Sequence, residues 1–116
     1  MSEIQAQIEA LRQFHRERDW KQFHNPKDLA ISLSLEASEV LELFQWKSPE
    51  EIAEFAVTGK QEIQEELADV FNWVLVMCDD LGIDIIKAAQ DKLEKNKLKY
   101  PVDKAKGRHT KYNKLI

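Results

Sequence analysis

Helix start signals recur along this chain and constrain its fold more than any other feature. At Ser2–Gln5, Asn25–Asp28 and Ser48–Glu51, a residue suited to the N-cap precedes a residue that favours the first helical turn. The second and third of these segments also place a proline at the first helical position, where its missing N–H is not needed. Apolar residues follow at helical spacing, beginning with Ile4 and Ile8 and continuing through Leu11 and Phe14 or His15. The pattern predicts a succession of α-helices.

Stop signals close these helices. Gly59 and Gly82 stand where C-cap glycines are expected, Asp84 can cap a last helix, and Pro101 prevents its continuation. We expect helices over residues 2–18, 26 to 45 or 46, 49–57, 60–81 and 85–100. The predicted fold is an all-α helical bundle of four main helices plus a short connecting helix. The tail from Val102 to Ile116 is expected to be irregular and basic.

The composition excludes several other classes. Three glycines and three prolines are too few for a many-turned β sandwich or barrel, and the isolation of each glycine excludes Gly-rich phosphate loops. The single Cys78 excludes an intramolecular disulfide and a cysteine-based zinc site, and suits a reducing compartment. No apolar run approaches the roughly 20 residues of a membrane span. With a net charge of -4, we expect a soluble cytoplasmic protein that binds neither membranes nor nucleic acid.

Two pairs of carboxylates interrupt the apolar positions of the two longest helices. Turning about 100° per residue places Glu36 inside an arc of leucine and valine side chains, with Glu39 one turn further on. Glu66 and Asp69 border the apolar face of the helix over residues 60–81. The i, i+3 spacing directs both members of a pair to the same side. Such pairs are common on solvated helices, but two pairs on successive long helices predict a shared site.

A site of this kind requires a cation. Four carboxylates facing one another would repel, and burying them unpaired costs many kcal/mol. Ligands restricted to carboxylate oxygens favour Mg²⁺, with Mn²⁺ as a substitute, over zinc. Di-iron bundles add Glu-x-x-His pairs, but none of His15, His24 and His109 stands three residues after a glutamate. We therefore expect metal ligands at Glu36, Glu39, Glu66 and Asp69.

Several blocks of the sequence resemble one known family. The motif Glu36-x-x-Glu39 followed by Glu66-x-x-Asp69 resembles the signature of the MazG-like nucleoside triphosphate pyrophosphohydrolases. Four further blocks are similar to the dCTP pyrophosphatase branch of that family: Glu17-Arg18-Asp19-Trp20-x-Gln22-Phe23-His24-x-Pro26, ELFQWK at 42–47, Glu65-Glu66-Leu67-x-Asp69-Val70, and Asn96-x-x-x-Tyr100-Pro101. The similarity runs from about Leu11 to Pro101 and covers most of the chain.

The resemblance implies an activity and an assembly. The expected reaction is Mg²⁺-dependent hydrolysis of a (deoxy)nucleoside triphosphate, dCTP or a related dNTP, to the monophosphate and pyrophosphate in nucleotide pool housecleaning. The expected assembly is a homo-oligomer, a dimer or a tetramer, in which residues 1–101 form one domain and residues 102–116 a basic tail. The residues that the resemblance assigns to substrate binding are Trp20 and Trp46 at the base, Trp73 at the sugar, and Lys92, Asn96 and Tyr100 facing the nucleotide.

One position departs from the dCTP branch. That branch has a base-contacting histidine in the first helix, and this chain has Leu11 there. The resemblance therefore leaves the preferred base open. For the reaction itself, a carboxylate must take the proton of the attacking water, and we assign this role to Glu39. Aromatic residues near helix ends also serve as core or interface residues, and lysines often form solvated faces, so the substrate contacts are hypotheses.

Two rival functions stay open. A phosphoribosyl-ATP pyrophosphohydrolase also uses helix carboxylates on a diphosphate bond, although Trp20 and the block Phe44–Trp46 speak against it. A non-enzymatic helical dimerisation module would carry its acids as surface charges, and Mg²⁺ would then leave its melting temperature unchanged. Apolar residues, including Ile31 and Leu41, lie nearly all round the second helix. Such a helix needs cover on more than one side, which favours an oligomer for each of these functions.

Overall fold

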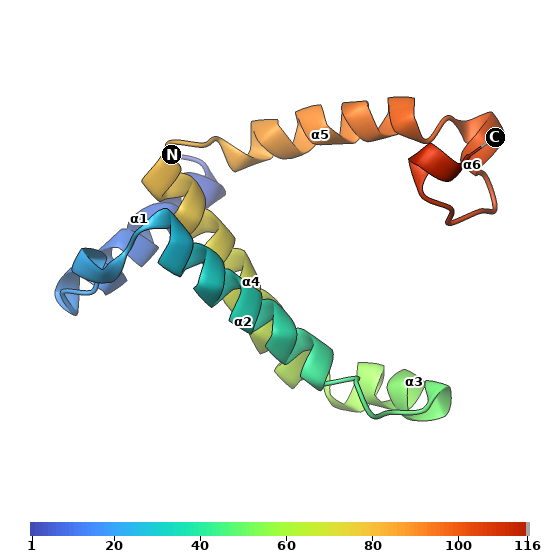
Figure 1. Ribbon diagram of the computed structural model, residues 1–116. Coiled ribbons are helices and arrows are strands. Elements are labelled where there is room, and N and C mark those ends of the chain that lie inside the picture. Colours follow the sequence, from blue (N-terminus) through green and yellow to red (C-terminus); the bar gives the residue numbers. More distant parts are fainter. Residues whose placement is uncertain (116) are drawn as a thin grey trace. The chain divides into compact units, whose positions relative to one another are not determined.

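Six α-helices and two short 3₁₀ helices make up the computed structural model, which describes residues 1–115 (Figure 1). They are α1 (Glu3–Glu17), η1 (Lys21–Phe23), α2 (Pro26–Glu42), α3 (Pro49–Thr58), α4 (Lys60–Leu81), α5 (Ile85–Lys99), α6 (Val102–Ala105) and η2 (Tyr112–Lys114). No strand occurs within the described residues, which confirms the predicted all-α class. Over the same range, no helix is both long enough and apolar enough to cross a membrane.

The predicted start signals cap the helices. The Ser2 hydroxyl accepts a hydrogen bond from the backbone N–H of Gln5 at 3.1 Å, and the Ser2 N–H donates to Gln5 Oε1 at 2.9 Å. Ser48 and Glu51 form the same reciprocal box at the start of α3. The Asn25 side chain accepts from the first turn of α2. These bonds satisfy amide groups that an α-helix leaves free at its N-terminus, so α1, α2 and α3 begin where the sequence predicts.

The end of α2 differs from the prediction. The α-helix stops at Glu42, about one turn early, because the chain beyond it tightens into three-residue turns such as the hydrogen bond from Lys47 N–H to the Phe44 carbonyl at 3.0 Å. The Lys47 ammonium donates to the Leu43 carbonyl at 2.6 Å. In the tail, which we expected to be irregular, α6 and η2 each form a single turn.

The chain forms two compact units, residues 1–82 and the residues from Ile83 onward. In the first unit, α2 and α4 lie side by side and run in opposite directions, and α1 and α3 pack against α4 (Figure 1). The buried apolar residues of this unit gather where the start of α2 meets the C-terminal half of α4; they are Leu29, Leu75, Val76 and Cys78. The core thus occupies one half of α4.

Several apolar side chains of the first unit remain exposed in the single chain. On α4, Leu67 and Phe71 are 52% and 46% exposed, although both lie on the face that the sequence marks as apolar. On α2, Ile31 and Leu41 are similarly exposed. These side chains are available to a second copy of the chain, and the oligomer stays a prediction.

A sharp corner joins α1 to η1. Asp19 adopts a left-handed backbone with φ of 55°, a conformation that aspartate tolerates better than most residues. The Gln22 side-chain amide donates to both the carbonyl and the carboxylate of Asp19, at 2.9 and 3.0 Å. The corner brings Trp20 edge-on to the Phe14 ring, with centroids 5.6 Å apart. Trp20 is therefore held against the end of α1.

Two further contacts fix the helices around α4. Arg12 of α1 donates through Nε to Asp79 Oδ2 of α4 at 2.9 Å, and this bond holds the pKa of Asp79 below its usual value. Between α3 and α4 the chain passes through Gly59 alone, which is buried under the ring of Phe55. A Cβ atom on Gly59 would overlap that ring. Glycine is thus required for the close approach at this junction.

Candidate metal centre and adjoining cavities

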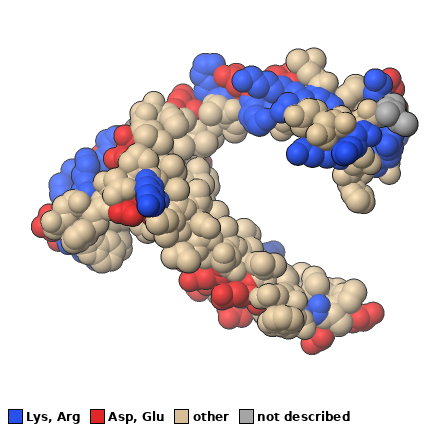
Figure 2. Space-filling model, viewed as in Figure 1, with Lys and Arg blue, Asp and Glu red and all other residues tan. Residues whose placement is uncertain are grey.

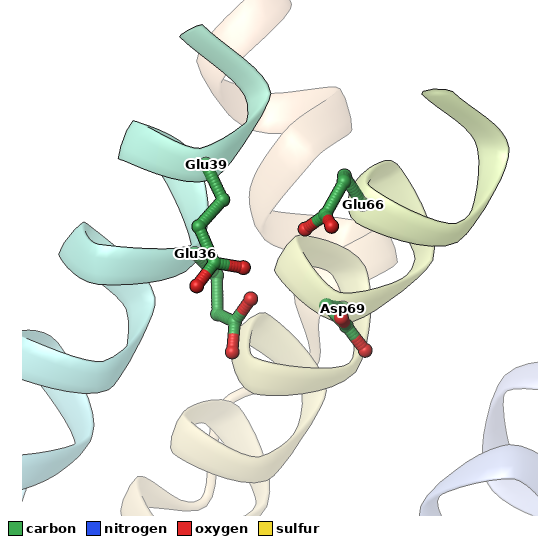
Figure 3. Close-up of side chains that lie close together, drawn as sticks. All are labelled: Glu36, Glu39, Glu66 and Asp69. Atoms are coloured by element: carbon green, nitrogen blue, oxygen red, sulfur yellow. The ribbon is translucent and has the colours of Figure 1, made fainter. Parts of the chain in front are cut away.

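Four carboxylates converge between α2 and α4 in the structure. Glu36 and Glu39 of α2 face Glu66 and Asp69 of α4 (Figure 3). One carboxylate oxygen of each residue lies within 4.8 Å of those of the other three. The i, i+3 spacing keeps each pair on one side of its helix, and the opposite directions of α2 and α4 bring the two pairs to the same level. The structure therefore brings together all four residues that the sequence singled out.

The burial of these acids is uneven. Glu36 and Glu66 are partly buried, and Glu39 and Asp69 are exposed. Within the described residues, the buried oxygens Glu36 Oε2 and Glu66 Oε2 have no hydrogen-bond partner. Burial, followed by the effects of Glu39, raises the pKa of Glu36 to about 7. Hydrogen bonding to Glu39, followed by burial, raises the pKa of Glu66. Without a cation, the cluster therefore takes up protons near neutral pH.

The donor set fits a hard divalent cation. An ionised carboxylate only accepts hydrogen bonds, so the two buried oxygens on opposite helices cannot satisfy each other. A proton or a cation can satisfy both, and a cation also removes the repulsion between the four charges. The cluster contains no imidazole and no thiol, and an oxygen-only set suits Mg²⁺ or Mn²⁺ better than zinc.

A cavity of about 400 Å³ adjoins the cluster, because Asp69 forms part of its wall. We call it the Asp69 cavity. Trp20 and Trp73 line it, together with Leu11 and His15 of α1. A second cavity of about 330 Å³ shares the two tryptophans. The flat aromatic walls suit an aromatic ring, and a carboxylate cluster that holds a cation suits an anionic group. The two together suit a ligand that joins an aromatic ring to an anionic group.

The other predicted substrate residues lie elsewhere in the chain. Trp46 lies in the turn after α2 and is 87% exposed. Lys92 and Asn96 belong to α5, and Tyr100 forms the C-cap of that helix, with its ring edge-on to Tyr112. Lysine and arginine side chains gather along α5 and the residues that follow it (Figure 2). The contacts of these residues with a nucleotide stay predictions.

Sequence reasoning did not single out His15 as a site residue. The helical period of α1 allows either Phe14 or His15 to face inward, and the structure buries His15, which is 8% exposed. Phe14 is 43% exposed. The available signal was the spacing of four residues from Leu11, which puts His15 one turn along the same face.

Comparisons with known proteins bear on this site. The model of the MazG-like family matches residues 31–115, a range that includes all four clustered acids. Curated relatives named dCTP pyrophosphatase 1 are 38% identical in Rattus norvegicus and 34% identical in Homo sapiens, over 105 residues or 89% of this chain. The chain spans 62% of the length of these relatives. The crystal structure of a pyrophosphatase from Archaeoglobus fulgidus is 41% identical with a TM-score of 0.82, covering 87% of this chain and 94% of that one.

Proposed function

This chain belongs to the MazG-like family, and we propose that it hydrolyses a (deoxy)nucleoside triphosphate to the monophosphate and pyrophosphate. The observation that carries the proposal is the convergence of four carboxylates, two of which have buried oxygens without a hydrogen-bond partner in the described residues. The relatives named dCTP pyrophosphatase 1 and the structural neighbour named a pyrophosphatase support the same reaction. We propose dCTP or a related dNTP as substrate, and nucleotide pool housecleaning in the cytoplasm as the role.

In this proposal the residues that hold Mg²⁺, or Mn²⁺ in its place, are Glu36, Glu39, Glu66 and Asp69. The bound cation would neutralise phosphate oxygens and stabilise the pyrophosphate leaving group. Glu36 and Glu66 contribute the buried oxygens, and their lack of donors leaves them free to act as ligands. Glu39 and Asp69 are exposed and can also reach the substrate or a water molecule.

The chemical step that we propose uses one of these carboxylates as a general base. Glu39 accepts a proton from water while the water oxygen forms a bond to the α-phosphorus. The bond from the α-phosphorus to the bridging oxygen breaks, and its electron pair leaves with pyrophosphate. The base and sugar lie in the Asp69 cavity against Trp20 and Trp73. Further contacts are assigned to Trp46, Lys92, Asn96 and Tyr100.

We further propose that the protein works as a homo-oligomer, a dimer or a tetramer. The half-exposed apolar side chains of α2 and α4 support this, since they lie beside the acid cluster in sequence and would be covered by a second copy. In this assembly, residues 1–101 serve as the catalytic domain and residues 102–116 as a basic tail.

The direct test is pyrophosphate release with Mg²⁺ across all canonical dNTPs and NTPs, 5-methyl-dCTP and phosphoribosyl-ATP, with EDTA as control. We expect chelator-sensitive release of pyrophosphate and monophosphate from a dNTP. Glu36→Gln and Asp69→Asn should fold and lose activity, whereas Glu54→Gln on α3 removes the same charge away from the cluster and should retain it. Activity in both cluster variants would refute the metal site.

The same panel separates the rivals. Preference for phosphoribosyl-ATP would assign the chain to the other class of pyrophosphohydrolase. No release from any substrate, together with a melting temperature that Mg²⁺ leaves unchanged, would favour the dimerisation module.

A further inference from the structure

A buried imidazole lies among aromatic rings at the end of α1. The His15 ring is nearly parallel to Trp73, with centroids 5.8 Å apart and an interplanar angle of 29°. It meets His24 edge-on at 4.7 Å. None of the side-chain hydrogen bonds of α1 within the described residues involves His15. The His15 side chain is therefore largely buried without a hydrogen bond to the described residues, and its ring nitrogens are not among the fully buried unpaired atoms, so they remain open to a cavity.

A ring nitrogen that reaches a cavity can form a hydrogen bond with water or with a ligand there. The His15 side chain forms part of the wall of the Asp69 cavity and also of a third cavity of about 520 Å³, whose wall carries several charged side chains, so a neutral partner suits the Asp69 cavity. Burial first, and then His24 and Arg18, lower the pKa of His15. At neutral pH the ring is therefore uncharged, with one donor and one acceptor nitrogen. Such a ring suits a neutral hydrogen-bonding edge better than a phosphate.

Two other neutral polar side chains of this wall form a hydrogen bond with each other. Gln7 Nε2 donates to Asn72 Oδ1 at 3.0 Å across the space between α1 and α4. Asp69 belongs to the acid cluster, and Leu11 offers no polar atom. Beside the two tryptophans, whose indole N–H groups can only donate, His15 therefore offers the wall both a neutral donor and a neutral acceptor.

We propose that His15 determines base specificity by forming a hydrogen bond with the edge of the nucleobase in the Asp69 cavity. Trp20 and Trp73 provide the aromatic surfaces beside which the base lies. This inference rests on the proposed function, because the acid cluster next to Asp69 then holds the triphosphate end of the same molecule. The ligand class is a nucleotide whose base is recognised by one hydrogen bond and by stacking.

The test compares kcat/KM for dCTP, dTTP, dATP and dGTP in the wild type and in His15→Phe, which keeps an aromatic ring and removes the nitrogens. We expect about a tenfold loss on the preferred base and less than a threefold loss on the others, so that the ranking flattens. His15→Gln keeps a donor and an acceptor and should retain part of the preference. The matched control is His24→Phe, because His24 borders the two neighbouring cavities and not the Asp69 cavity. It should keep the wild-type ranking.

Retention of the ranking in an active His15→Phe protein, or its loss in His24→Phe alone, would overturn this inference and leave the proposed function standing. Absence of hydrolysis in the wild type would refute the proposed function. Binding to the cavity is decided separately by the ring ¹⁵N resonances of His15 in the wild-type protein, titrated with dCMP, dTMP, dAMP and dGMP. A chemical-shift change that occurs with only one of the four nucleotides supports the assignment. Resonances that do not move when each nucleotide is added to saturation overturn it, and this outcome does not depend on whether the variants fold.

Discussion

The Glu36→Gln variant is expected to be more stable than the wild type in the absence of metal and less stable than the wild type in Mg²⁺. Glutamine has nearly the same shape and no charge. In the metal-free fold the pKa of Glu36 is raised from 4.5 to about 7, so at pH 8 its carboxylate is ionised beside three others. The substitution removes that repulsion at pH 8 and removes a proposed ligand in Mg²⁺.

The magnitude follows from the structure in two ways. A rise of the pKa from 4.5 to about 7 corresponds to about 3 kcal/mol at pH 8, an upper value because Glu36 is only partly buried. Two unit charges 4.8 Å apart repel by about 3 kcal/mol at an effective dielectric of 20 and by about 1 kcal/mol in bulk water. We therefore expect a gain of about 1–3 kcal/mol, or roughly 3–15 °C in melting temperature.

The pH dependence has a definite sign. Because the folded pKa lies above the unfolded one, the protonated Glu36 stabilises the fold fully below about pH 4.5, and this contribution is lost as the pH rises through 7. Wild type and variant should therefore converge at pH 4.5 and separate at pH 8. In Mg²⁺ at 1,000 times its Kd the wild type gains about 4.1 kcal/mol, which exceeds the variant's expected advantage of about 1–3 kcal/mol, whereas the variant lacks one proposed ligand and gains little, so the order of stability reverses.

The assay is thermal unfolding at one protein concentration, in EDTA and in MgCl₂, at both pH values. Glu54→Gln serves as the control for the removal of a negative charge, since Glu54 lies on α3 and forms no ion pair with another described residue. A Glu36→Gln protein that melts no higher than this control in EDTA at pH 8 would refute the account of the cluster.

Three further perturbations test other parts of the structure. Adding MgCl₂ to weakly buffered protein at pH 6 should release protons, because Glu36 is then largely protonated, and should release few at pH 9; a pH-stat showing equal release at both values contradicts this. Gly59→Ala should lower the free energy of unfolding in urea by about 1–3 kcal/mol, because the new Cβ overlaps the Phe55 ring, and an unchanged midpoint would mean that the ring moves freely. Arg12→Ala should lower the melting temperature only slightly, since Arg12 is half exposed in its ion pair with Asp79, and 1 M NaCl should narrow the difference; a large loss that 1 M NaCl leaves unchanged would show that Arg12 acts through packing.

The helix limits could be predicted wherever a capping residue marks them. The predicted range of α4 agrees with the structure at both ends, where Gly59 and Gly82 flank it, and Gly82 adopts the left-handed conformation with φ of 68°. The end of α2 has no such mark. The apolar period continues past Glu42, but the Lys47 side chain and a series of three-residue turns replace the last turn of the helix.

The convergence of the acids could be predicted because it depends on spacing within two helices and on their antiparallel packing. The orientation of α1 could not, since one residue of rotation exchanges Phe14 for His15 and both satisfy the helical period. The hydrogen bonds of Asp19 with Gln22 and the corner that they fix also depend on tertiary structure. The roles of the predicted site residues stay predictions until the assays are done.

The layout of α4 has a consequence for how this protein changes over evolutionary time. Leu75, Val76 and Cys78 bury the core in its C-terminal half, and Glu66 and Asp69 lie several turns earlier, beside half-exposed neighbours. Within the single chain, mutations beside the acids therefore remove few buried contacts, so ligand preference can change around a retained Glu66 and Asp69 at little cost to the folding of one chain. The helix separates a segment on which folding of the chain depends from one whose constraints come from the site and from assembly.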